Sequence, residues 1–196
     1  MSNSLMPNPL TLLSVNLIYL DMNGTCIRLE DIVKKNEYLK IKNFEDIQAF
    51  REILGGIELI TSGHYVFYQS YEIYDLESAV WFLMETLDNE VVNNESKLFN
   101  SDYSYLEVQQ NADLTSISYK PNPEIKTNRR NVFYFDELHI EKKYWNTACK
   151  IALEEYFQMM NMYCNEDCLK DSYINKLIEL GTLLITKNPK GSNVYR

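Results

Sequence analysis

One continuous stretch, residues 55–89, sets most of what this chain can fold into. Residues 57–61 and 64–68 are rich in β-branched and aromatic side chains, and Ser62 and Gly63 stand between them. Two such runs separated by a short turn are typical of a β-hairpin. An amphipathic pattern then begins at Asp75. The stretch therefore predicts a hairpin that leads directly into a helix.

The helix predicted from Asp75 to about Asn89 has two distinct faces. The Asp75 carboxylate is placed to cap the N-terminus by accepting a hydrogen bond from an early backbone N–H, and Glu77 follows in the first turn, where the helix dipole favours a negative charge. One face is apolar and is expected to be buried: Leu76, Ala79, Val80, Leu83, Met84 and Leu87. The other face places Trp81 among the carboxylates of Glu77, Glu85 and Asp88.

Two interpretations of this aromatic region stay open. A large exposed aromatic ring among charges is typical of a protein-binding hot spot, and tyrosine combines a rigid contact area with a polar tip. Alternatively, a second element covers Trp81, and the tyrosines pack across strands within a sheet. The aromatic residues concerned are Tyr65, Tyr68, Tyr71, Tyr74 and Trp81.

The rest of the chain predicts an α+β fold, with a mostly antiparallel sheet of hairpins packed by helices. Residues 1–196 are expected to form a single domain, with a flexible lead over residues 1–9 and a mobile loop over residues 89–102. The predicted strands cover residues 10–20, 25–29, 103–110, 114–120 and 131–140, and a helix is predicted over residues 43–54 and ended by Gly55 and Gly56.

The C-terminal part of the chain, residues 141–186, is expected to form a helical hairpin packed on the sheet or on a second subunit. The apolar face of the first of its two helices is predicted to point into the core. That face comprises Tyr144, Ala148, Ile151, Ala152, Tyr156, Met159 and Met162. Packing on a second subunit would make the protein a homodimer joined through these helices.

Charge narrows the class of partner. The chain carries a net charge of −9, and residues 43–95 hold eleven acidic residues and one arginine, a local net charge of −10. Such a region disfavours nucleic acids and anionic membranes, which need Lys and Arg to neutralise phosphates. It favours a basic protein partner or good solubility. The four scattered cysteines and the lack of an export signal predict a cytoplasmic protein with reduced thiols.

The sequence contains no common nucleotide-binding, hydrolase or zinc-protease motif, so we expect no cofactor, metal or catalytic residues. Glu137, His139 and Glu141 would share one face of a strand, which fits either a transition-metal site or an ordinary solvent-facing strand. An ordinary solvent-facing strand would give these three residues no functional role.

The order of one helix, three strands and another helix resembles the core of the PD-(D/E)xK nuclease superfamily. In that family, an acidic residue on one strand and an E-x-K motif on the next bind Mg²⁺ and activate water. Asp113 and the run from Glu141 to Lys143 match these positions in type, but Asp113 is predicted in a turn and Glu141 at the end of a strand. A metal-dependent nuclease is therefore the alternative function.

A small acidic α+β protein with a carboxylate-rich aromatic face resembles the immunity proteins of bacterial polymorphic toxin systems. The resemblance rests on layout and charge between Asn43 and Glu95, and it implies a non-enzymatic, cytoplasmic inhibitor that covers a basic toxin or effector. A structural or oligomerising protein of phage or bacterial origin is a third alternative. The predicted partner-binding residues are Glu58, Tyr65, Tyr68, Tyr71, Glu72, Tyr74, Asp75, Glu77, Trp81, Glu85 and Asp88.

Overall fold

The computed structural model describes nine segments of the chain, and every structural statement below concerns these residues. They are 12–21, 23–35, 53–61, 66–67, 74–87, 96–100, 104–123, 135–164 and 166–187. Two antiparallel sheets and a set of helices form an α+β fold, which confirms the predicted class. The predicted flexible lead, residues 1–9, lies outside the described segments, and the single-domain assignment stays a prediction.

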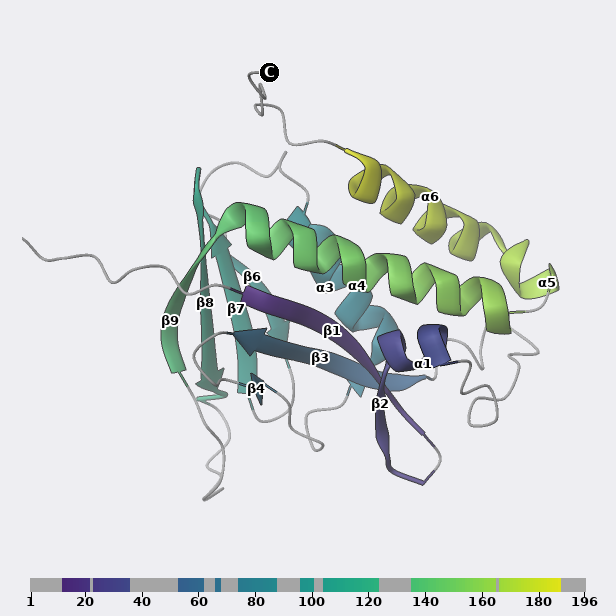
Figure 1. Ribbon diagram of the computed structural model, residues 1–196, viewed down its shortest axis with the longest axis horizontal. Coiled ribbons are helices and arrows are strands. Elements are labelled where there is room, and N and C mark those ends of the chain that lie inside the picture. Colours follow the sequence, from purple (N-terminus) through teal and green to yellow (C-terminus); the bar gives the residue numbers. More distant parts are fainter. Residues whose placement is uncertain are drawn as a thin grey trace, which may run out of the picture.

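The first sheet lies beneath the longest helix (Figure 1). Its strands are β1 (Leu12–Leu20), β2 (Cys26–Arg28), β3 (Leu54–Thr61), β4 (Val66–Phe67) and β5 (Tyr74–Asp75). They follow the order β2-β1-β3-β4, and β5 also pairs with β3. The predicted hairpin of β3 and β4 is confirmed by their antiparallel pairing. Its predicted turn at Ser62 and Gly63 lies outside the described residues.

The turn between β1 and β2 is held by hydrogen bonds among its own residues. The Asp21 carboxylate accepts hydrogen bonds from the backbone N–H of Asn23 at 2.9 Å and of Thr25 at 2.7 Å. Gly24 has a φ of 76°, a left-handed conformation that glycine adopts without steric cost. The Asn-Gly pair therefore fixes this hairpin through local chemistry.

The predicted role of Gly55 and Gly56 as the end of a helix is wrong, because both residues lie inside β3. Gly55 pairs with Tyr19 of β1, and a Cβ atom at Gly55 would stand 2.3 Å from the Ile18 carbonyl oxygen and 2.9 Å from a methyl group of Leu76. Glycine is needed here for the close approach of three elements rather than for a helix cap. Residues 43–52 of the predicted helix lie outside the described residues.

The second sheet has four strands in sequence order: β6 (Ser96–Asn100), β7 (Ser104–Gln110), β8 (Leu114–Pro121) and β9 (Phe135–Glu141). The predicted β7–β8 hairpin and the predicted strand near residue 140 are confirmed. The prediction of a mobile loop over residues 89–102 is wrong in its second half. Residues 96–100 pair with β7 along their whole length, because tertiary pairing outweighs the polar composition of this short segment.

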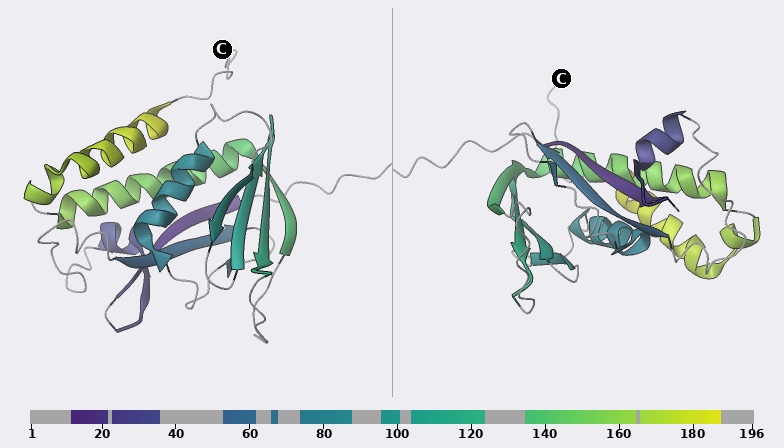
Figure 2. Two further views of the ribbon diagram at one scale, coloured as in Figure 1. Left: turned by 180° about the vertical axis from the view of Figure 1, so that it is seen from behind. Right: turned by 90° about the horizontal axis from the view of Figure 1, so that it is seen from below.

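Five helices complete the described fold: α1 (Leu29–Lys35), α3 (Leu76–Leu87), α4 (Lys142–Tyr163), α5 (Glu166–Leu169) and α6 (Ser172–Thr186). Helix α4 starts directly after β9, crosses the first sheet, and is followed by α6, which returns alongside it (Figures 1 and 2). The predicted C-terminal helical hairpin is thus confirmed. None of the described helices is long and apolar enough to cross a lipid bilayer.

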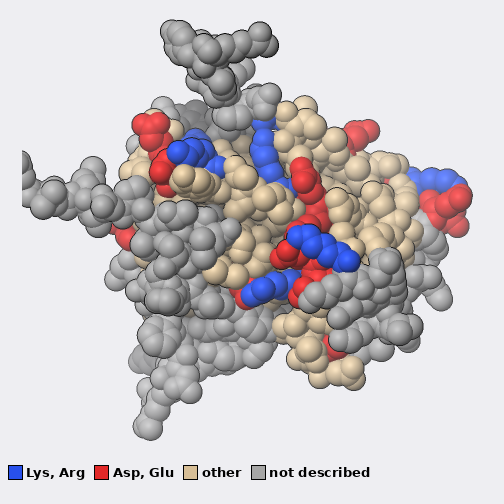
Figure 3. Space-filling model, in the orientation of Figure 1, with Lys and Arg blue, Asp and Glu red and all other residues tan. Residues whose placement is uncertain are grey.

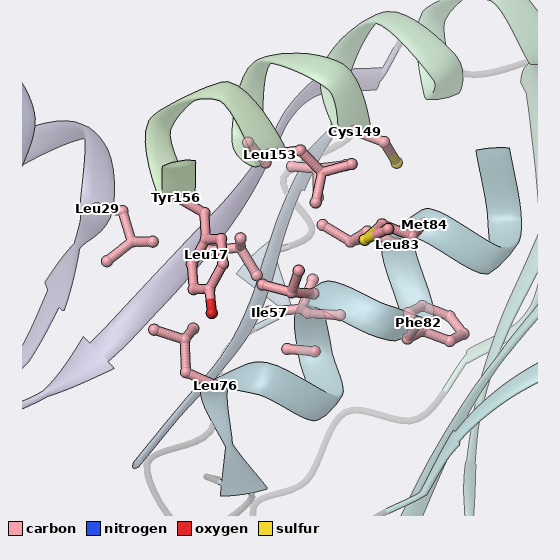
Figure 4. Close-up of a cluster of buried hydrophobic side chains, with 14 of the residues drawn as sticks. Leu17, Leu29, Ile57, Leu76, Phe82, Leu83, Met84, Cys149, Leu153 and Tyr156 are labelled. Atoms are coloured by element: carbon pink, nitrogen blue, oxygen red, sulfur yellow. The ribbon is translucent and has the colours of Figure 1, made fainter. Parts of the chain in front are cut away.

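The core lies where α4 and α3 meet the first sheet (Figure 4). Leu17 and Ile57 point from the sheet, Leu83 from α3, and Leu153 and Tyr156 from α4. The buried indole N–H of Trp145 donates to the Thr86 hydroxyl at 3.1 Å, which satisfies a polar group inside the contact between the two helices. The same core cluster includes residues of the second sheet, among them Leu106, Val108, Ile117 and Ile140.

The buried face of α4 is rotated from the predicted one. Tyr144, Ile151 and Met162 were expected in the core but are exposed by 38%, 50% and 38%, respectively. Ala148, Ala152, Tyr156 and Met159 are buried as predicted, and four residues that were not predicted are buried as well: Trp145, Cys149, Met160 and Tyr163. Both sets repeat at helical spacing, so periodicity alone fixes the helix but not the rotation about its axis.

Candidate protein-binding surface

The structure describes only part of the predicted binding surface. Tyr65, Tyr68, Tyr71, Glu72 and Asp88 lie outside the described residues. Of Tyr74, only the backbone is described, and it pairs with Gly55. The predicted site residues with described side chains are Glu58, Asp75, Glu77, Trp81 and Glu85.

Glu58 does not present its charge to solvent. The residue is buried on β3 at 6% exposure, and the Arg28 guanidinium donates to its carboxylate through Nε at 2.6 Å and Nη2 at 2.9 Å. The Asn16 amide donates a third hydrogen bond at 2.6 Å. A bidentate arginine and an amide satisfy a buried carboxylate, so this group joins β1, β2 and β3. We therefore leave Glu58 out of the proposed surface.

Asp75 caps α3 as predicted. One of its carboxylate oxygens accepts from the Ser78 backbone N–H at 2.6 Å, and the other accepts from the Ser78 hydroxyl at 2.7 Å. These bonds satisfy a backbone donor that the first turn of a helix otherwise leaves without a partner. Both oxygens of this carboxylate are thus engaged in stabilising the helix start.

A hydrogen-bond chain links α3 to α6 through the predicted aromatic face. The Trp81 indole N–H donates to the Tyr173 hydroxyl at 2.9 Å, and that hydroxyl donates to the Glu77 carboxylate. Trp81 is half-buried and packs against the core cluster. Another element, α6, therefore contacts this face of α3 at Trp81. Glu85, one turn further along α3, is exposed.

The structure reveals a different acidic cluster, between α1 and α4, that the sequence analysis did not identify. It comprises Glu30 and Asp31 of α1 and Glu154 and Glu155 of α4, with Lys34 at its border. Acidic and basic side chains gather over this part of the molecule in Figure 3. These residues lie more than 120 positions apart in the sequence, so their proximity follows from packing of α1 on α4 and not from any local pattern.

Glu155 is the most unusual member of this cluster. The residue is only 9% exposed, and none of the described residues forms a hydrogen bond or ion pair with its carboxylate. Burial, together with the nearby charges of Glu30, Glu154 and Asp31, raises its pKa from the usual 4.5 to about 7, against the opposing effect of Lys34. The Lys34 amine is itself ion-paired with Glu30. Glu155 thus has acceptor capacity that the described fold does not use.

Exposed apolar side chains accompany Glu155 along α4. Ile151 precedes Glu155 by four residues and Met162 follows it by seven, so the three side chains share one face of the helix. We call this set, Ile151, Glu155 and Met162, the α4 seam. Exposed apolar side chains on either side of an unneutralised acid are typical of a surface that is completed by another molecule.

The residues of the alternative nuclease site do come near one another, at the corner between β8, β9 and α4. The backbone carbonyl of Asp113 accepts from the Lys142 N–H at 2.8 Å, and Leu114 pairs with Glu141. Asp113 is exposed in the β7–β8 turn, as predicted. The Glu141 carboxylate forms an ion pair with Lys143 at 2.6 Å, so one cation of the chain already occupies it.

The predicted alignment of Glu137 and His139 on β9 is also seen. His139 Nδ1 lies 3.0 Å from the Ser116 hydroxyl, and its Nε2 lies 3.8 Å from the Glu137 carboxylate, which is too long for a hydrogen bond. Among the residues that the structure describes, no group of three or more His, Cys, Asp or Glu side chains is placed to hold a metal ion.

Comparisons with known proteins add no family to this description. The chain matches no protein-family model, no curated protein and no solved structure. The function is therefore inferred from the chemistry of the chain's own residues.

Proposed function

We propose that this chain is a non-enzymatic, cytoplasmic protein-binding inhibitor of the immunity type, which neutralises a basic toxin or effector through an acidic surface. The observation that carries the proposal is the recessed carboxylate of Glu155, a residue that is 9% exposed, has no hydrogen-bonding or ion-pairing partner among the described residues and stands beside Glu30 and Asp31. A buried carboxylate without a counter-ion is costly in an isolated protein. A cationic partner would remove that cost, so the site favours binding of a basic protein.

The surrounding surface supports binding to a protein rather than to a small cation alone. Ile151 and Met162 are exposed on the same face of α4, and burial of apolar area is the main source of affinity in protein interfaces. The net charge of −9 would steer a basic partner toward the molecule over a distance of about one Debye length. Charge would thus select the partner and apolar contact would retain it.

A second candidate, the metal-dependent nuclease, is favoured by the proximity of Asp113 to the start of α4. Its test is hydrolysis of DNA with Mg²⁺, which the Asp113→Asn and Glu141→Gln variants would have to abolish. The overall negative charge works against this function, because it repels a polyphosphate substrate. An oligomerising role through α6, where Leu183 is 58% exposed, is tested by light scattering on the purified chain.

The proposed function is tested by protection of a bacterial host. The gene beside the one that encodes this chain is expressed alone and together with it, and growth is compared. We expect the neighbouring product to be toxic, and co-expression to restore growth through a stoichiometric complex that co-purifies. Toxicity that persists at a full molar excess of this chain would rule the proposal out, and so would protection at a small fraction of the toxin's amount, which indicates catalysis.

A further inference from the structure

The three residues of the α4 seam follow one another along one side of the helix. Ile151 is 50% exposed, Glu155 follows one turn later at 9%, and Met162 lies two turns beyond it at 38%. The seam therefore offers an apolar contact, a recessed carboxylate and a second apolar contact along one helix face. Figure 3 shows acidic and basic side chains side by side near the centre of one face of the molecule.

Groups on both helices shape the electrostatics around Glu155. Glu30, Asp31 and Lys34 act on it from α1, and Glu154 acts on it from α4 itself. Three of these four groups are acids, and the Lys34 amine is engaged by Glu30. The net field at the Glu155 carboxylate therefore attracts a further positive charge.

We propose that the α4 seam is the docking surface for a segment of a basic protein that places one arginine side chain on Glu155 and apolar side chains on Ile151 and Met162. This inference rests on the proposed function and states which surface performs it. Arginine fits better than lysine, because its planar guanidinium can engage both carboxylate oxygens at once and loses less hydration on burial. Partner side chains at helical spacing would match the four- and seven-residue steps of the seam.

The described part of the α3 face is a weaker candidate for the same role. Asp75 uses both carboxylate oxygens on Ser78, and the Glu77 carboxylate accepts from Tyr173. Glu58 is neutralised by Arg28. Glu85 is the exposed one among the predicted partner-binding acids that the structure describes. The α4 seam, by contrast, combines an acceptor without a partner with exposed apolar side chains.

The probe is a synthetic amphipathic peptide with one arginine between leucines at helical spacing, and its matched control carries citrulline, a neutral isostere, at that position. Affinity is measured by calorimetry with the full chain at pH 8. We expect the arginine peptide to bind about tenfold or more tightly than the citrulline peptide, and Glu155→Gln to remove that difference. Glu154→Gln removes the same charge from the exposed neighbouring position and should change affinity less than about threefold.

The pH dependence separates a contact at Glu155 from general attraction. The free Glu155 carboxyl has a pKa of about 7, so its ionised fraction falls about tenfold between pH 8 and pH 6. Affinity of the wild-type chain for the arginine peptide should fall by about the same factor, and that of Glu155→Gln should not. Ile151→Ser should weaken both peptides alike, because it removes apolar contact and no charge.

Several results would overturn the inference. They are absence of binding by the arginine peptide, equal binding of both peptides, equal effects of Glu154→Gln and Glu155→Gln, or no effect of Ile151→Ser. If Glu155→Gln does not fold, the citrulline peptide and Ile151→Ser still decide the matter. In the protection assay, a Glu155→Gln variant that protects as well as the wild type would refute this surface and leave the proposed function standing. Failure of the wild type to protect would refute the function itself.

Discussion

Glu58 and Glu155 are both buried glutamates, but they differ in whether a partner neutralises the carboxylate. Glu58 accepts three hydrogen bonds from Arg28 and Asn16, whereas none of the described groups forms a hydrogen bond or ion pair with the Glu155 carboxylate. Burial therefore holds Glu155 partly protonated near neutral pH. The two residues differ because packing places a cation against Glu58 but not against Glu155.

The stability of the fold should depend on pH through Glu155. Its pKa is raised to about 7 in the folded state from the usual 4.5, so the folded state holds this proton more tightly than the unfolded state does. The contribution to stability is present in full below pH 4.5 and is lost as the pH rises toward 7 and above. At pH 8, Glu155→Gln should therefore be more stable than the wild type by roughly 1–3 kcal/mol.

Urea denaturation at pH 5 and pH 8 checks this prediction, with Glu154→Gln as the exposed control that should show little change at either pH. A wild-type chain and a Glu155→Gln variant that differ equally at both pH values would contradict the assignment of the shift to Glu155. Such a result would also remove the main argument for an unsatisfied acid on α4.

At the scale of residues, sequence patterns predict hydrogen bonds within one turn but not contacts between residues far apart in the chain. The Asp75 cap, confirmed by its bonds to Ser78, depends only on residues within one turn. Glu58 was predicted to contribute charge to the partner-binding surface, yet residues 55–59 of β3 are all buried. Arg28, thirty positions away, neutralises it. No periodicity in the sequence signals that pair or the cluster around Glu155.

At the scale of elements, the helices and hairpins were predictable, and their contacts were not. The spacing of apolar residues identified α3, α4 and α6, because a 3.6-residue period survives in any environment that buries one face. The rotation of α4 was missed, since it depends on Trp145, whose buried indole reaches Thr86 of α3. That rotation is what exposes Ile151 and Met162.

Gly55 gives the sharpest test of how the elements fit together. Gly55→Ala would place a methyl group 2.3 Å from the Ile18 carbonyl oxygen, a backbone atom that cannot move aside without shifting β1. We expect a loss of about 2–3 kcal/mol in the free energy of unfolding, measured by urea denaturation. Leu54→Ala, at the exposed neighbouring position, should cost less than 1 kcal/mol, as surface substitutions do. Equal effects of the two variants would contradict this packing.

At the scale of the whole molecule, α4 connects the two sheets. It begins at the end of β9 in the second sheet and crosses the first sheet to reach α1 and α6 (Figure 1). Its buried side contributes to the core, and its exposed side carries the seam. The net charge, read from composition, predicts the sign of the partner, but only the fold shows where an acid lacks a counter-charge.

The central claim is that this chain acts by binding a basic protein through complementary charge, and the association rate constant tests it most directly. The chain is mixed in a stopped-flow instrument with the toxin against which it protects, at increasing concentrations of NaCl. We predict that the association rate constant falls by about tenfold or more from low to high salt, while the dissociation rate constant changes much less. An association rate constant that does not respond to salt would contradict the claim.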